Sequence, residues 1–143
     1  MLSTVERVIF LQGIDVFAHV SSEDLVHIAA ITDEVEVEEG QVIYRESEIA
    51  DCMYVVIQGE FRVERDGVEV MIARKHDAVG TWSLFDDERR IATATAITSG
   101  ELLKIDKEDF VDLLSDHVKI TQGIMKTIVK RLRSLMSNIN RPA

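Results

Sequence analysis

Two kinds of hydrophobic spacing divide the chain, and the first is helical. Val5, Val8, Ile9 and Leu11 recur at the spacing of an amphipathic helix, and this pattern ends near Gly13. A second helix is predicted at about 21–31, because serines followed by acidic residues are typical of a capped start. We expect these two short helices to pack together.

From position 32 to position 105 the spacing changes to short runs rich in β-branched residues and punctuated by glycines. Within 61–70, alternating segments flank Asp66-Gly67, a two-residue turn whose positive φ angles suit a twisted hairpin. The sequence therefore predicts an all-β core of many short strands over about 32–105.

Helical spacing returns after the last strand, so C-terminal helices are predicted over about 106–139. Asp106 can cap the first of them, and a longer helix follows at about 118–139. Its hydrophobic residues step by three and four, as in a coiled-coil seam, which favours a homodimer; the alternative is that this stripe packs on the β core. Gly123 weakens the helix. The stripe consists of Val118, Thr121, Met125, Ile128, Leu132, Leu135 and Ile139.

Length and composition indicate one folded domain, 1–143. The chain has 143 residues, of which 46% are hydrophobic and 29% charged, as in ordinary globular proteins. No apolar run is long enough to span a bilayer, and the Met1 end lacks the features of a signal peptide. We expect a cytoplasmic protein without membrane insertion, in which the single cysteine, Cys52, is a small buried hydrophobe.

Charge is unevenly distributed along the chain. The net charge is −10, yet all 26 acidic residues lie before position 117. An acidic body repels nucleic acid and anionic membranes at long range, so the basic tail is expected to meet an acidic surface of its own protein or of a partner. The alternative is that it forms the solvated back of a helix. The tail contains Lys119, Lys126, Lys130, Arg131, Arg133 and Arg141.

Residues for metal or nucleophilic chemistry are scattered. A jelly-roll-like core would also suit a metal-dependent cupin enzyme, but the histidines (His19, His27, His76 and His117) do not fall at ligand spacing within one strand. No Ser/His/Asp or Cys/His arrangement stands out either. We therefore expect neither a metal site nor an enzyme.

Four segments together resemble one known family. Segments 40–48 and 50–63 are similar to the first strands of the cyclic-nucleotide-binding domain family, and 79–85 with 90–94 resembles its phosphate-binding cassette. With the flanking helices, the similarity covers nearly the whole chain. It implies a mainly β double-stranded β-helix, a jelly-roll-like β-roll, with N-terminal helices and a long C-terminal helix. It also implies a regulatory module like the catabolite-activator sensor domain, without the DNA-binding domain.

The residues of the cassette are chemically suited to binding a phosphate. Gly80 leads into a short helical turn whose first N–H groups can hold a phosphate. Arg90, arriving from the next strand, can grip that phosphate with two parallel hydrogen bonds. The resemblance implies cAMP or cGMP as the ligand and no cofactor. The predicted ligand-binding residues are Gly80, Thr81, Trp82, Ser83, Arg90, Ile91 and Ala92.

Two departures from the family pattern bear on ligand binding. Thr81 stands where such domains usually have a glutamate for the ribose 2′-hydroxyl, and losing such a contact costs about 1.5–3 kcal/mol. Ile91 replaces a small or hydroxylated residue, and its bulk could narrow the pocket. The acidic residues at 86–88 would oppose an anion if they faced inward. Ser47, in place of a turn glycine, affects backbone freedom.

Arg90 and Trp82 also have structural explanations that involve no ligand. Arg90 could balance neighbouring acids at the surface, and Trp82 is more often core filling than a base-stacking platform. Two functions remain: a switch operated by a cyclic mononucleotide, held weakly by a degenerate cassette, or a ligand-free dimerisation or docking domain. Few residues follow the long helix, so direct DNA binding is not expected, and the chain resembles modules of larger parent proteins.

Overall fold

The computed structural model describes residues 1–139, so Arg141 of the predicted basic tail and the last positions of the predicted 1–143 domain lie outside it. The elements follow the predicted order, with short N-terminal helices, a run of strands and two C-terminal helices. The elements are α1 (Thr4–Gln12), the 3₁₀ helix η1 (Asp15–Phe17), α2 (Ser22–Ala29), β1 (Thr32–Val37), β2 (Val42–Tyr44), β3 (Cys52–Gln58), β4 (Phe61–Arg65), β5 (Val68–Ala73), β6 (Ala78–Val79), the 3₁₀ helix η2 (Thr81–Leu84), β7 (Thr93–Ala96), β8 (Gly100–Asp106), α3 (Lys107–Asp116) and α4 (Val118–Ile139).

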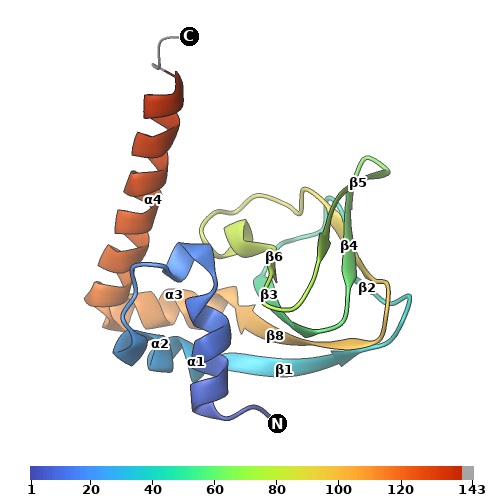
Figure 1. Ribbon diagram of the computed structural model, residues 1–143, viewed down its shortest axis with the longest axis horizontal. Helices are drawn as coiled ribbons and strands as arrows, with labels where there is room; N and C mark the ends of the chain where they lie inside the picture. Colours follow the sequence, from blue (N-terminus) through green and yellow to red (C-terminus); the bar gives the residue numbers. More distant parts are fainter. Residues whose placement is uncertain (140–143) are drawn as a thin grey trace.

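The strands form two four-stranded sheets that make up the β-roll on one side of the molecule, with the helices on the other (Figure 1). The sheet orders are β1-β8-β3-β6 and β2-β7-β4-β5, and every pairing is antiparallel. The roll begins at Thr32, where β1 pairs with the end of β8, as predicted. The predicted fold class, a mainly β roll with flanking helices, is confirmed.

The hairpin predicted at 61–70 is formed by β4 and β5. Asp66 and Gly67 make the turn with φ angles of 52° and 78°, as the prediction required. Arg65 lies opposite Val68 across the turn, and Phe61 lies opposite Ala73 at the far end. This hairpin forms one wall of the cavity described below.

The N-terminal helices are capped by serines and pack side by side. In α1 the Ser3 hydroxyl accepts from the Glu6 N–H while the Glu6 carboxylate accepts from the Ser3 N–H, and Gly13 ends the helix. The second helix is shorter than its predicted range of 21–31. It stops at Ala29 because Thr32, already in β1, donates its hydroxyl to the Ala29 carbonyl at 2.7 Å.

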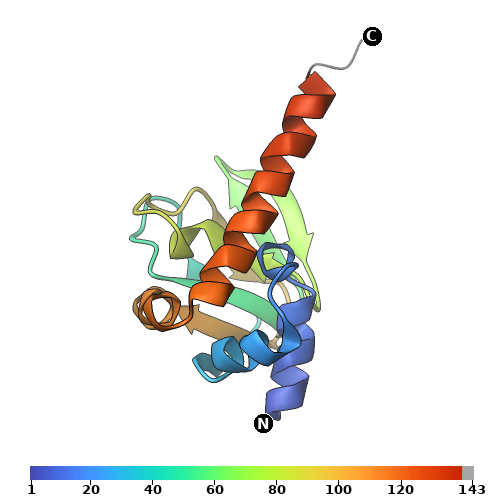
Figure 2. The ribbon, with the colours of Figure 1, turned by 90° about the vertical axis from the view of Figure 1, so that its left-hand side faces the viewer.

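The long helix α4 packs through a different face from the predicted stripe. The hydrophobic residues of the stripe are exposed from Val118 to Ile139 and Thr121 is half-buried, so the interpretation in which that stripe packs on the β core is wrong. Ile120, Gly123, Ile124 and Thr127 are buried instead, against η1 and α3. The reason is steric: a Cβ at position 123 would lie 2.5 Å from the His19 carbonyl oxygen, so glycine permits the close crossing. Beyond this contact, α4 extends away from the rest of the molecule (Figures 1 and 2).

Two hydrophobic cores share the central strands β3 and β8, whose side chains alternate between the two faces of the sheet. Met53, Val55 and Ile57 face the helices, while Val56 faces the roll interior. Asp106 ends β8 and caps α3 by accepting from the Glu108 N–H at 2.9 Å, as predicted. The sheet thus joins the interior of the roll to the core beneath the helices.

Candidate functional site

A cavity of about 470 Å³ opens in the β-roll beside η2. It is lined by all seven predicted ligand-binding residues, so the structure brings Gly80–Ser83 and Arg90–Ala92 together around one hollow. Its walls are mostly apolar and come from both the roll and the hairpin. The other lining residues are Tyr44, Ala50, Val63, Arg65, Val70, Met71, Ala78, Val79, Asp86, Glu88 and Arg89.

Gly80 introduces η2 in a conformation that favours glycine, with φ of 73°. A Cβ at this position would collide with Nη1 of Arg90, so only glycine leaves room for the guanidinium. The first backbone bond of the turn runs from the Ser83 N–H to the Gly80 carbonyl at 3.2 Å. The N–H groups of Thr81 and Trp82 precede that bond and have no acceptor within the turn.

Arg90 lies in the loop between η2 and β7, and not on the next strand as predicted. Two backbone bonds fix this loop, from the Arg90 N–H to the Glu48 carbonyl at 2.9 Å and from the Ser47 N–H to the Arg90 carbonyl at 2.8 Å. Ser47, with φ of 69°, adopts a left-handed turn conformation that glycine takes more readily than other residues. This loop, rather than a strand, therefore sets the position of the Arg90 side chain at the cavity.

The Arg90 side chain is buried, with 7% of its surface exposed, so a surface role balancing nearby acids is wrong. Its Nη2 donates to the Cys52 carbonyl at 2.8 Å and lies 3.4 Å from Cys52 Sγ. Nε and Nη1 are buried without any hydrogen-bond partner, and no ion pair within residues 1–139 involves Arg90. Buried unpaired donors cost free energy, and an anion in the cavity would supply the missing acceptors.

Two tyrosines lie next to this cation. The guanidinium carbon of Arg90 is 4.1 Å from the ring centroid of Tyr44, and the Tyr44 and Tyr54 rings stack at 6.4 Å. Burial raises the pKa of both phenols above the usual tyrosine value, although the charge of Arg90 acts in the opposite direction. Both rings are therefore neutral at physiological pH and add no negative charge to the site.

Trp82 and Ile91 lie at the rim of the cavity and do not fill it. Trp82 is 70% exposed, so the core-filling interpretation is wrong, and Ile91 is 50% exposed. Ser83 is buried instead, and its hydroxyl lies 2.6 Å from both the Cys52 and Gly80 carbonyl oxygens. Ser83 therefore holds η2 against β3, and its side chain is already engaged.

The three acidic residues after η2 are exposed. Asp87 pairs with Lys107 of α3 at 2.9 Å, and this contact lowers the pKa of the Asp87 carboxyl. Asp86 and Glu88 line the cavity, as do the exposed Arg65 and Arg89. The lining therefore combines the buried positive charge of Arg90 with exposed charges of both signs.

Sequence reasoning missed Tyr44, Arg65 and the hairpin residues Val70 and Met71. Tyr44 belongs to a segment used for the family resemblance, but nothing local to it points to position 90. Arg65 sits beside the predicted Asp66-Gly67 turn, and only the folding of the hairpin over the roll brings it to the cavity. Strand pairing, which the sequence does not specify by itself, supplies these residues.

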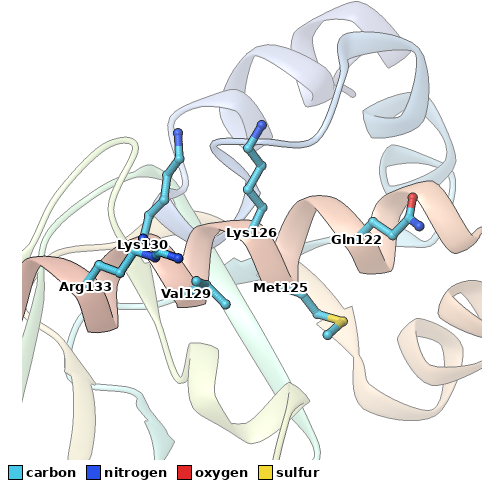
Figure 3. A pocket seen from close by; sticks show the side chains of 6 residues that line it. All are labelled: Gln122, Met125, Lys126, Val129, Lys130 and Arg133. Atoms are coloured by element: carbon cyan, nitrogen blue, oxygen red, sulfur yellow. The ribbon is translucent and has the colours of Figure 1, made fainter.

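A second hollow, of about 540 Å³, lies along α4. Every residue that lines it comes from this one helix, so nothing encloses it. Figure 3 shows Lys126 and Lys130 extending on the same side of the helix. The lining residues are Gln122, Met125, Lys126, Val129, Lys130 and Arg133.

The histidines are less scattered than the sequence suggested. The rings of His27 and His117 stack with centroids 4.1 Å apart, which joins α2 to the junction of α3 and α4. Within residues 1–139 no three His, Cys, Asp or Glu side chains gather closely enough to hold a metal ion. None of the helices in this range has the length and hydropathy needed to cross a bilayer.

Comparison with known proteins connects this geometry to a family. The sequence model of the cyclic nucleotide-binding domain matches residues 34–117. A lysophospholipase of Emericella nidulans is 32% identical over 119 residues, covering 80% of this chain but 8% of that enzyme. A CRP-like cAMP-activated global transcriptional regulator of Mycobacterium tuberculosis is 28% identical over 120 residues, covering 78% of this chain and 54% of that protein. The chain thus spans a small part of the first and about half of the second.

Solved structures agree with the sequence match. The N-terminal domain of a transcriptional regulator from Streptomyces coelicolor superposes with a TM-score of 0.83 at 26% identity, covering 92% of this chain and 96% of that one. The sensor domain of the regulator DNR from Pseudomonas aeruginosa shares the fold, with a TM-score of 0.72 at 20% identity, covering 98% and 97%. The chain belongs to the cyclic nucleotide-binding domain family.

Proposed function

We propose that this domain is a non-catalytic regulatory module whose cavity binds the phosphate of a cyclic mononucleotide, cAMP or cGMP, without contacting DNA itself. The observation that carries the proposal is Arg90, a buried guanidinium with two nitrogens that have no hydrogen-bond acceptor, at the cavity formed by the cassette. An anionic ligand would supply the missing acceptors. The N–H groups of Thr81 and Trp82 would bind the same phosphate.

Binding is expected to be weaker than a complete cassette allows. Thr81 carries a short hydroxyl in place of a carboxylate, so the ribose loses a charge-assisted hydrogen bond. That loss corresponds to about ten- to a hundred-fold in affinity. Ile91 remains half exposed at the rim and leaves the cavity open.

A physical route connects the cavity to α4. Phe85, at the end of η2, packs edge-on against Phe110 of α3 at 5.7 Å, and Lys107 of α3 bonds the Asp86 carbonyl and the Asp87 carboxylate. His117 is the junction between α3 and α4. Ordering of η2 by a ligand would therefore shift the balance of α3 and α4 positions.

Thermal unfolding with cAMP or cGMP, followed by calorimetric titration, tests the proposal. Ligand at about 100 times its dissociation constant should stabilise the fold by about 2.7 kcal/mol. Arg90→Ala should weaken binding by about 100-fold, because at least one charge-assisted bond and the buried positive charge are lost. Arg74→Ala is the matched control, since Arg74 is exposed and does not line the cavity. No shift at millimolar ligand would refute nucleotide binding.

The second candidate is a dimerisation or docking domain that works without a ligand. The exposed hydrophobic stripe of α4 favours it, because Leu132, Leu135 and Ile139 are each more than half exposed. A homodimer through this stripe is compatible with either function. Mass measurement in solution tests it: Leu132→Asp should convert a dimer to a monomer, whereas Lys119→Asp, outside the stripe, should not.

A further inference from the structure

We infer that Tyr44 is a positioning residue that holds the empty anion site in its receptive geometry by seating the Arg90 guanidinium on the face of its ring. The inference rests on the proposed function and identifies a residue that the cassette itself does not contain. Tyr44 is nearly buried and lines the cavity, and its ring centroid lies 4.1 Å from the guanidinium carbon. This distance is well within the range of a cation–π interaction.

A neutral aromatic ring is a better neighbour than a carboxylate for an arginine that binds an anion. A carboxylate in contact with Arg90 would use its N–H groups and would repel an incoming phosphate. The face of a neutral ring attracts the cation without accepting a conventional hydrogen bond from Nε or Nη1. Those two nitrogens accordingly have no partner, while Nη2 is fixed by the Cys52 carbonyl at 2.8 Å.

The backbone supports the same arrangement from both sides. Tyr44 ends β2 and pairs with Ala94 of β7, and the turn that follows Tyr44 is bonded to Arg90 through Ser47 and Glu48. Tyr44 and Arg90 are thus held near each other by the pairing of β2 with β7 and by the bonds between the turn after β2 and the loop before β7. Gly80 closes the other side, where a Cβ would displace Nη1.

The first experiment needs no nucleotide. In ¹⁵N-labelled protein, the Arg90 Nε–H resonance is identified by its loss in Arg90→Met. A proton above an aromatic ring is shielded and resonates upfield. Tyr44→Leu should therefore remove the upfield shift of the Arg90 Nε–H resonance and speed its exchange with water. Tyr44→Phe should preserve the upfield shift and the slow exchange. If Tyr44→Leu leaves the resonance unchanged, the inference is overturned. Tyr44→Met carries the same comparison if the leucine variant unfolds.

The second experiment measures affinity for cAMP and cGMP in a double-mutant cycle. Tyr44→Leu should weaken binding about ten-fold, as the strength of such interactions implies, and Tyr44→Phe should stay within about two-fold of the unmodified protein. In the Arg90→Met background, Tyr44→Leu should have no further effect. Independent, additive effects would contradict a role exerted through Arg90.

The two experiments separate the inference from the proposed function. If the unmodified protein binds neither nucleotide while the Arg90 resonance depends on the ring as expected, nucleotide binding fails and the positioning role stands. If nucleotide binds through Arg90 but Tyr44→Leu binds equally well, the function stands and the positioning role fails.

Discussion

The core beneath the helices and the interior of the β-roll share strands β3 and β8, yet they are built in opposite ways. The helical core is filled by large side chains, among them the fully buried Phe17 and Phe110. The roll interior contains a single phenylalanine, Phe61, together with four small residues, and it leads to the cavity that holds Arg90. Those small residues are Ala73, Ala92, Ala94 and Ala96.

The two regions therefore contribute differently: the helical core stabilises the fold, whereas the roll interior is shaped for binding. In the helical core every buried side chain gains from exclusion of water, so that side supports the fold. In the roll a buried cation lacks partners for Nε and Nη1, which costs free energy in the empty state. Such a cost is typical of a site shaped for a ligand that completes it. Substitutions on the two sides should therefore differ in size and even in sign.

The largest effect is expected in the filled core. Phe110→Ala removes a fully buried ring that contacts Phe17 and Phe85, and it should lower the free energy of unfolding by about 3–5 kcal/mol. Urea denaturation measures this loss. Val111→Ala on the same helix, where the side chain is 46% exposed, should change stability by about 0.5 kcal/mol or less. Equal losses would remove the distinction between the packed and exposed faces of α3.

A smaller loss is expected at the border of the cavity. Gly80→Ala places a Cβ at φ of 73° and against Arg90 Nη1, so stability should fall by about 1–3 kcal/mol and nucleotide affinity should fall with it. Gly67→Ala is the matched control, because its φ is 78° and nothing lies within 4 Å of the new Cβ.

The difference between these two glycine variants isolates the collision with the guanidinium. Gly80→Ala should be partly rescued in an Arg90→Met background, since the flexible thioether can move away. Identical losses for the two glycines would mean that backbone strain alone accounts for the effect.

Arg90→Met should change stability in the opposite direction from the two preceding variants. Replacing a buried cation that has no ion-pair partner among the described residues with an apolar side chain should leave stability unchanged or raise it by up to about 2 kcal/mol, while nucleotide binding weakens about 100-fold. Denaturation without ligand measures the first part and titration the second. Arg74→Met, at an exposed ion pair with Glu60, should alter neither. A loss of more than about 1 kcal/mol for Arg90→Met would identify Arg90 as a structural residue.

The smallest effect is a pH dependence of stability at the alkaline end. Because burial raises the pKa of Tyr44 and Tyr54 in the folded state, the unfolded chain loses these protons first, near its ordinary tyrosine pKa of about 10. The stabilisation is fully present below that pH and decreases above it. Urea denaturation between pH 8 and pH 11 should show this decline, and Tyr54→Phe should make it shallower. An unchanged slope would assign the decline to other groups.

Much of the architecture follows from local sequence. The Asp66-Gly67 turn, the Asp106 cap and the α4 range were predicted because each depends on residues that are neighbours in the chain. The seven proposed ligand residues were also predicted, since they form two short segments carrying the family resemblance.

Other features depend on residues that are distant in sequence. The sequence predicted the hydrophobic stripe of α4 but not that a different face of the helix would pack, because the fit of Gly123 against the His19 carbonyl exists only once η1 and α4 cross. Arg90 was expected on a strand, and its loop is fixed by bonds to Ser47 and Glu48, more than forty positions earlier.

The amino-acid sequence by itself determined the elements of this protein, because helix caps, tight turns and hydrophobic periodicity act over a few residues. Only the tertiary structure decided that Arg90 is buried on the Tyr44 ring with two donors unpaired, and that Trp82 stays exposed. Burial and unmet hydrogen bonds are properties of surroundings, and the surroundings of Arg90 come from strands that meet only when the roll closes.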